Sequence, residues 1–221
     1  MWGKTTLGDA RPTSQSIVAL QTDAELDDYT YRVAGCVGGF WTKVCVAHQF
    51  PRPKVSTHEP LSETPFEQLG VRFGKGLQLV NILRDLPRDL RNGRCYLPVD
   101  QLTEIGLTPA DLLQPTNEAQ LRPLYHRYLD LAESHLAAGW NYTKLIPRGQ
   151  LRVRLACAWP ILIGVKTIKK LRGTNVLDPS QRVKISRNEV RNLIVKSVLL
   201  YPFSRRWNSQ FSSAARDCKC G

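Results

Sequence analysis

Hydrophobic side chains recur along most of this chain at steps of three and four residues, which is the spacing of one face of an α-helix. The pattern predicts helices over 23–46, 66–86, 117–145, 151–171 and 186–200. No long stretch alternates apolar and polar residues as a half-buried strand would, and no internal repeat is visible. The sequence therefore predicts an all-α fold, with helices packed on helices around one core.

Local signals mark where several of these helices begin and end. Two begin with a capping box, in which a Ser or Thr and a Glu three residues later satisfy the first free N–H groups. The two pairs are Thr22 with Glu25 and Ser186 with Glu189. Prolines predict a loop over 48–65, and Asn92-Gly93 predicts a turn. Pro87 has no N–H to donate and restricts Leu86, so the helix before it is expected to end or kink there.

Charge is distributed unevenly along the chain, which has 31 basic and 19 acidic residues. Residues 144–221 contain 17 of the basic residues and only 3 of the acidic ones, so the whole positive excess lies there. A basic face attracts the phosphate groups of nucleic acids, anionic lipids or diphosphate substrates. The alternative is a solvated surface whose long side chains cover apolar helix faces. The chain shows neither zinc-finger spacing nor an RNA-recognition signature, so we expect no nucleic-acid partner.

The apolar segments are too short to cross a membrane. The best candidate, 155–165, is about half as long as the roughly 20 residues that a spanning helix needs, and it contains Pro160. Residues 1–10 lack the apolar stretch of a signal peptide, and the six cysteines form no CxxC pair. Dispersed cysteines of this kind are typical of reduced thiols in a cytosolic protein. We expect a cytoplasmic protein whose basic region can touch the anionic inner face of a membrane.

The segment with candidate chemistry lies at the end of the helix predicted over 66–86 and just beyond it. Asn81, Asp85 and Asp89 follow one another at steps of four, which stacks their oxygens on one helix face. Mg²⁺ prefers such oxygens, taking one or two carboxylates and leaving its other positions to water and phosphate. Arg84 beside them adds a planar donor suited to phosphate. The alternative is a charged surface whose Asp and Arg side chains make ordinary ion pairs.

Small residues interrupt the helix predicted over 23–46, at Ala34, Gly35, Gly38 and Gly39. Glycine destabilises a helix interior, so these positions need another reason. Something must approach the backbone closely here, and two candidates remain open. One is another helix packed against this one, and the other is a bound ligand.

Two stretches, 29–38 and 78–98, resemble the squalene/phytoene synthases, which are head-to-head condensing enzymes of the class I isoprenoid synthase fold. The resemblance extends over about residues 22–200. It implies a helical bundle of the isoprenoid synthase type that lacks the family's N-terminal helices, as an N-terminally truncated member would. The domain organisation predicted on this basis is a poorly defined segment over 1–22, the helical domain over 23–201 and a basic tail over 202–221.

The resemblance also implies roles for individual residues. Tyr29, Asp85 and Asp89 match catalytic positions, and Asn81 joins the two aspartates as a magnesium ligand. The residues matched to substrate contacts are Gln78, Arg84 and Arg182 at the diphosphate and Ala34, Gly35, Val37 and Gly38 along the prenyl cavity. The implied substrates are farnesyl or geranylgeranyl diphosphate, and the implied cofactor is Mg²⁺. Members that form squalene also use NADPH, whereas members that form phytoene or dehydrosqualene lose a proton instead.

The chain departs from the family pattern in two places. No first aspartate-rich motif precedes Tyr29, and Arg88 stands where the family usually has an acid, which would weaken Mg²⁺ binding. The leading interpretation is a truncated prenyl transferase of the squalene, dehydrosqualene or phytoene synthase type. Two alternatives stay open: a non-catalytic relative of the assembly-factor type, and a basic module that binds membrane surfaces.

Overall fold

The computed structural model describes residues 17–48, 50 and 65–216, most of which are helical. The longer helices are α1 (Asp23–Thr30), α2 (Cys36–His48), α3 (Pro65–Arg91), α5 (Glu118–Leu145), α6 (Leu151–Arg172) and α7 (Arg187–Leu200). The shorter elements are the strands β1 (Val18–Ala19) and β2 (Arg94–Cys95), the helices α4 (Val99–Glu104), α8 (Ser204–Asn208) and α9 (Gln210–Arg216), and the 3₁₀ turns η3 (Asp111–Leu113) and η4 (Pro115–Asn117). A π-helical turn, η2 (Tyr31–Gly35), joins α1 to α2. The predicted all-α fold is confirmed.

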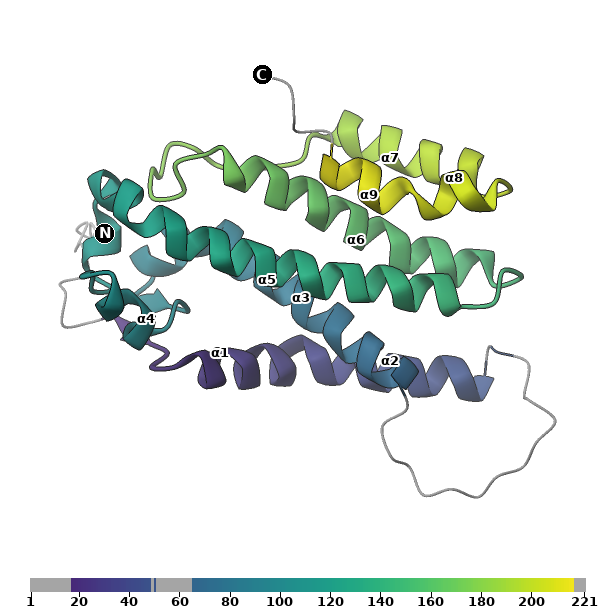
Figure 1. The fold of residues 1–221 in the computed structure, drawn as a ribbon, viewed down its shortest axis with the longest axis horizontal. Helices are drawn as coiled ribbons and strands as arrows, with labels where there is room; N and C mark the ends of the chain where they lie inside the picture. The colour runs from purple at the N-terminus through teal and green to yellow at the C-terminus, as the bar shows by residue number, and fades with distance from the viewer. Residues whose placement is uncertain (1–16, 49, 51–64, 217–221) are drawn as a thin grey trace, which may run out of the picture.

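The long helices form layers around α3 (Figure 1). Helices α5 and α6 run side by side, and α3 crosses α5 toward the rod that α1, η2 and α2 form together. Helices α7 and α9 cover the outer side of α6. Helix α3 thus contacts the rod, α5 and α6. These three neighbours fix the position of α3 and, with it, the side chains on its remaining face.

The hydrophobic core follows from the helical spacing of the sequence. Leu79, Leu83, Leu86 and Leu90 are buried along α3 at steps of three and four. They belong to one cluster with buried residues of α5 and α6. The helices predicted over 117–145, 151–171 and 186–200 are confirmed as α5, α6 and α7, with ends that differ by one residue.

The two expected capping boxes differ in outcome. At α7, Ser186 Oγ accepts from the Glu189 N–H at 3.2 Å and Glu189 Oε2 accepts from the Ser186 N–H at 2.8 Å, so that box is confirmed. At α1, Thr22 Oγ1 accepts from the Glu25 N–H at 3.2 Å, as predicted. The Glu25 carboxylate, however, accepts from the Gln21 N–H at 2.7 Å. The second half of this box is therefore made one residue earlier, because the extended backbone before the helix brings that N–H within reach.

A two-residue parallel ladder ties the chain before α1 to the chain after α3. Val18 pairs with Arg94 and Ala19 with Cys95, and the Leu20 N–H donates to the Cys95 carbonyl at 3.2 Å. The sequence predicts no strand here, because a ladder this short leaves no alternation of residues to detect. Its effect is to hold the start of α1 beside the end of α3.

Helix α3 continues through Pro87 to Arg91, so the expected end of the helix at Leu86 is wrong. Proline removes the N–H that would bond to the carbonyl of Leu83, four residues earlier. The hydroxyl of Tyr125, on α5, donates to that carbonyl at 3.0 Å. Tyr125 is fully buried, so this bond replaces the missing backbone bond inside the core. A partner this distant in sequence leaves no trace in the local pattern.

The turn expected at Asn92-Gly93 is confirmed, with Gly93 in the left-handed region at a φ of 73°. The loop predicted over 48–65 lies almost entirely outside the described residues. Cys218 and Cys220 also lie outside them, and the four described cysteines are free thiols. Within the described ranges, no helix is long and apolar enough to span a bilayer.

The chain after α7 belongs to the helical domain. The side chain of Trp207, on α8, is buried and stacks on Trp140 of α5 with ring centroids 4.8 Å apart. Trp140 Nε1 also donates to the carbonyl of Asn208 at 3.0 Å. Aromatic packing thus anchors residues 204–216, which lie in the stretch expected as a basic tail over 202–221, on the bundle.

Tyr125→Phe tests the bond that replaces the one removed by proline. Without the hydroxyl the Leu83 carbonyl is buried without a partner, and we expect the free energy of unfolding in urea to fall by about 1–3 kcal/mol. Adding Pro87→Ala restores an N–H for the same carbonyl and should recover most of the loss. Tyr31→Phe, at an exposed ring, is the control. Equal stability of Tyr125→Phe and the wild type would contradict this explanation.

Candidate functional site

One face of helix α3 lines two neighbouring cavities. Phe73, Gly74 and Leu77 line an apolar groove, and Arg84 and Asp85, two turns further on, line a basic pocket. With a rise of about 1.5 Å per residue, Leu77 and Asp85 are roughly 12 Å apart along the helix axis. An elongated ligand with an apolar tail and a charged head could therefore contact both.

The apolar groove has a volume of about 380 Å³ and lies between the rod, α3 and α6. The walls outside α3 are Val33, Ala34, Val37, Gly38 and Trp41 from the rod and Ala156 and Cys157 from α6. Three of the four predicted cavity residues, Ala34, Val37 and Gly38, thus come together here. Gly35 does not line the groove, because it is buried against the side chains of Lys75 and Val71 on α3.

The small residues of the rod are required by its close crossing over α3. A Cβ atom at Gly38 would lie 2.0 Å from the carbonyl oxygen of Gly70, and one at Gly74 would lie 2.1 Å from the carbonyl oxygen of Ala34. Such distances are far too short for real atoms, so backbone meets backbone at this crossing. Of the two expected reasons for the small residues, the packed helix is confirmed, and the groove opens beside the same crossing.

The basic pocket has a volume of about 370 Å³ and lies between α3, α6 and the segment before α7. Its cationic side chains are Arg84, Arg88, Arg182 and Lys184. The structure thus brings Arg182, far away in sequence, to the side of α3 that was predicted to face a diphosphate. Four cations around one cavity are suited to an anion with several oxygens.

Asp85 is the carboxylate among these cations. Arg84 donates to it through Nε at 3.0 Å and through Nη2 at 2.6 Å. This bidentate pair lowers the pKa of Asp85, and the positive charges of Arg88 and Arg182 lower it further. Asp85 is therefore ionised at neutral pH, and the pocket still keeps a positive excess.

Asp89 lies one turn beyond Asp85 in a different environment. Partial burial raises its pKa, and the charge of Asp85 raises it too. Tyr29 of α1 lies close by, with its ring 4.9 Å from that of Tyr96. Burial, a hydrogen bond with Tyr96 and the charge of Asp89 raise the pKa of Tyr29 to about 12. The predicted catalytic tyrosine and aspartate are thus neighbours, although neither lines the groove or the basic pocket.

The oxygens available for a metal are few. The part of the chain that the structure describes holds no cluster of three His, Cys, Asp or Glu side chains suited to a metal. Asp85, Asp89 and the exposed amide of Asn81 are a donor set of the kind that Mg²⁺ uses when water and phosphate fill its other positions. Burial and the charge of Asp85 both raise the pKa of Asp89, so a cation here would relieve charge repulsion. The donors fit Mg²⁺ shared with a phosphate-bearing ligand, and Gln78 lies half-buried one turn before Asn81.

Sequence reasoning assigns no site role to several residues that the structure places here. They are Arg94, Tyr96 and Lys184. Arg94 and Tyr96 fall within 78–98, and a cation and an aromatic residue within three positions after Gly93 were the available signal. Lys184 follows Arg182 by two positions in the segment before α7, and both line the basic pocket. Without knowing that the segment returns to α3, the sequence gives no reason to choose it.

Known proteins share both sequence and fold with this chain. The profile of the squalene/phytoene synthase family matches residues 5–189. A bifunctional lycopene cyclase/phytoene synthase of Aspergillus oryzae is 33% identical over 138 residues, which are 62% of this chain and 23% of that protein. A 15-cis-phytoene synthase of Synechocystis is 32% identical over 145 residues, which are 64% of this chain and 39% of that protein.

Solved structures agree in fold. The squalene synthase HpnC from Alicyclobacillus acidocaldarius gives a TM-score of 0.59 at 22% identity, covering 73% of this chain and 55% of that one. A ligand complex of TcSQS gives a TM-score of 0.68 at 18% identity, covering 90% of this chain and 62% of that one. The chain therefore spans less than half of the two sequence relatives and less than two thirds of these structures.

Gly38→Ala tests the crossing of the rod over α3. The added methyl group would have to displace the Gly70 backbone, and we expect the free energy of unfolding to fall by about 1–3 kcal/mol. Gly149→Ala is the matched control, since nothing lies within 4 Å of its Cβ position, and it should change stability by less than about 0.5 kcal/mol. If both variants unfold at the same urea concentration, the backbones do not touch as described.

Proposed function

The chain belongs to the squalene/phytoene synthase family, and from this premise we propose that it takes part in the head-to-head condensation of two prenyl diphosphates. The observation that carries the proposal is the pairing of an apolar groove with a basic pocket on one face of α3. A prenyl diphosphate is divided in the same way, into a long hydrocarbon chain and a diphosphate end. The relatives named phytoene synthase and squalene synthase support this class of reaction.

In this proposal the diphosphate lies in the basic pocket. Arg182 offers a planar fork for phosphate oxygens, and Arg88 and Lys184 add positive charge. Arg84 uses Nε and Nη2 on Asp85 and keeps further N–H donors for the ligand. The pocket can therefore bind the anion without breaking the pair that is already present.

Asn81, Asp85 and Asp89 would hold Mg²⁺ beside the diphosphate. When bound, the ion supplies positive charge that stabilises the departing diphosphate. The Arg84 hydrogen bonds lower the pKa of Asp85 most, and the positive charge of Arg88 lowers it further. Arg88 therefore competes with Mg²⁺ for the Asp85 carboxylate. We therefore expect Mg²⁺ to bind more weakly here than in relatives with an acid at position 88.

Departure of the diphosphate leaves an allylic cation that must be kept from water until the second prenyl chain attacks it. The apolar walls of the groove would shield the hydrocarbon chain from water on the sides that they contact. Tyr29 is protonated at neutral pH, as tyrosines ordinarily are, and burial raises its pKa further, to about 12. It would act as a neutral ring and hydroxyl. The neighbouring rings of Tyr29 and Tyr96 would stabilise a cation by about 0.5–2 kcal/mol.

One observation favours a second candidate, a relative that binds prenyl diphosphates without condensing them. Val37, Phe40 and Trp41 are 57%, 68% and 42% exposed, so the described residues leave the rod uncovered along the groove. A cation in an open groove would react with water. Condensation requires this side to be covered, whereas binding alone does not.

Product analysis and ligand binding separate the two candidates. The chain is incubated with farnesyl or geranylgeranyl diphosphate and Mg²⁺, with and without NADPH, and the lipid extract is searched for squalene, dehydrosqualene and phytoene. A product formed without NADPH supports the phytoene or dehydrosqualene type, and a product that requires NADPH supports the squalene type. Binding without product supports the second candidate. Absence of both binding and product contradicts both.

Arg182→Gln and Asp85→Asn test the assigned roles within the site. Arg182→Gln removes a charge-assisted bond, so binding of either prenyl diphosphate should weaken about tenfold or more in calorimetric titrations. Asp85→Asn should raise the Mg²⁺ concentration needed for half-maximal binding. Glu104→Gln, an exposed carboxylate on α4, is the control and should leave both quantities unchanged. An Arg182→Gln variant that binds like this control would exclude Arg182 from the site.

A further inference from the structure

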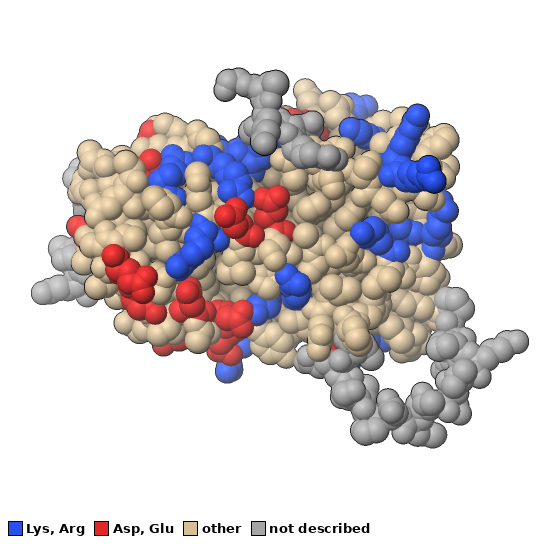
Figure 2. Space-filling view, in the orientation of Figure 1, with Lys and Arg blue, Asp and Glu red and all other residues tan. Residues whose placement is uncertain are grey.

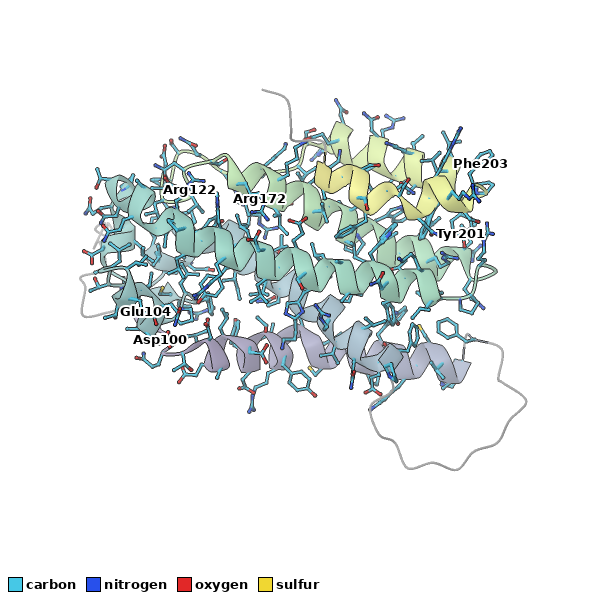
Figure 3. The ribbon with its side chains drawn as sticks, viewed as in Figure 1. Asp100, Glu104, Arg122, Arg172, Tyr201 and Phe203 are labelled. Atoms are coloured by element: carbon cyan, nitrogen blue, oxygen red, sulfur yellow. The ribbon has the colours of Figure 1, made fainter. Side chains whose placement is uncertain are left out.

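A small cavity lies at the end of the bundle where α5 turns into α6 and α7 turns into α8. It has a volume of about 140 Å³. Its walls are Lys144, Arg148, Arg154, Tyr201, Ser204, Trp207 and Asn208. Arg154 and Thr167 are 13 residues apart on α6, which separates this cavity from the basic pocket by roughly 20 Å. Figure 3 labels Tyr201 and Phe203 at this end, and Figure 2 shows Lys and Arg side chains gathered there.

Arg154 is buried at this cavity without a counter-charge. Arg154 is 5% exposed, and its Nε atom has no hydrogen-bond partner. The guanidinium lies over the rings of Trp207 and Tyr201, with Cζ 4.6 and 5.5 Å from their centroids. Burial lowers the pKa of Arg154, and the charge of Arg148 lowers it too. Because a buried arginine normally has an anionic partner, this one calls for a ligand.

The other walls add cations and donors and no carboxylate. Lys144 and Arg148 bring two further positive charges. Among the residues that the structure describes, neither forms an ion pair, and Arg148 Nη2 reaches only the Pro202 carbonyl at 3.4 Å. Trp207 Nε1 is a second buried donor without a partner. The Tyr201 hydroxyl donates to the backbone carbonyl of Arg148 at 2.6 Å, which fixes one wall of the cavity.

We propose that this cavity binds a phosphate group between Arg154, Arg148 and Lys144. A phosphate supplies the several acceptor oxygens and the negative charge that these donors lack. The volume holds a group of that size and is much smaller than the 380 Å³ groove. The phosphate is either free or the headgroup of a phospholipid. Exposed Leu199 and Phe203 at the same end, 67% and 56% exposed, are suited to the lipid surface.

Lys144→Gln combined with Arg148→Gln tests the site without altering the buried Arg154. Inorganic phosphate is titrated calorimetrically into the wild type and the double variant. We expect one binding event to weaken about tenfold or more. Phosphate bound in the basic pocket is unaffected by these changes and would be lost in Arg182→Gln instead. Arg191→Gln, at an exposed arginine of α7 that lines none of the cavities described, is the control.

Vesicles separate the two sources of the phosphate group. Wild type and variants are sedimented with phosphatidylcholine vesicles that contain or lack phosphatidic acid. Loss of phosphate binding in the double variant supports a free phosphate ligand. If the double variant loses only its sedimentation with the vesicles that contain phosphatidic acid, the result supports a headgroup. Phosphate and vesicle binding equal to that of Arg191→Gln in both assays would overturn the proposal.

Arg154→Lys provides a second variant in the same assays. It keeps the charge and removes the planar fork, so phosphate or acidic-vesicle binding should weaken while the melting temperature stays near that of the wild type. Full binding by a folded Arg154→Lys protein would remove Arg154 from the site and overturn the proposal as stated.

Discussion

The candidate site depends on the close crossing of the rod over α3. Gly38 lies against Gly70 and Gly74 against Ala34, so the two backbones touch and larger side chains would push the helices apart. That separation sets the width of the groove between the rod, α3 and α6. The π-helical turn follows Tyr29 directly, and its own residues Val33 and Ala34 line the groove. One rod can thus serve two parts of the site because its path over α3 is fixed.

The positive excess of the chain has more than one use in the structure. Part of it is structural: Arg172 donates to Asp130 at 2.6 Å and to Glu133 at 2.9 Å, and Arg122 donates to the Arg172 carbonyl at 2.9 Å (Figure 3). Another part gathers in the basic pocket and at the opposite end of α6, around Arg154. Acidic side chains gather instead over the end where α1 and α4 lie (Figure 2). The charge is therefore divided between separate cationic regions and not spread as one basic face.

Helices and their buried faces were predictable because their signal is local, as at Leu79, Leu83 and Leu86. The stacking of Asn81 and Asp85 was predictable for the same reason, and the family resemblance supplied Arg182. The remaining features depend on contacts between distant segments. The Tyr125 hydroxyl replaces a bond that Pro87 removes, and this keeps α3 helical as far as Asp89. Likewise, the sequence does not tell which side of the rod meets α3. The family resemblance places Gly35 at the cavity, whereas in the structure it packs against Lys75.

The central claim is that one face of α3 holds both ends of a prenyl diphosphate, and the position of a bound ligand tests it most directly. A farnesyl diphosphate analogue with a photoreactive group at the end of its hydrocarbon chain can be crosslinked to the chain and mapped by mass spectrometry. We predict labelling of groove residues such as Val37, Trp41 and Phe73. Unlabelled farnesyl diphosphate should protect these residues, and the labelling should be lost in the Arg182→Gln variant. Labelling in the cavity between α1 and α5, at Leu26 or Leu131, would contradict the claim.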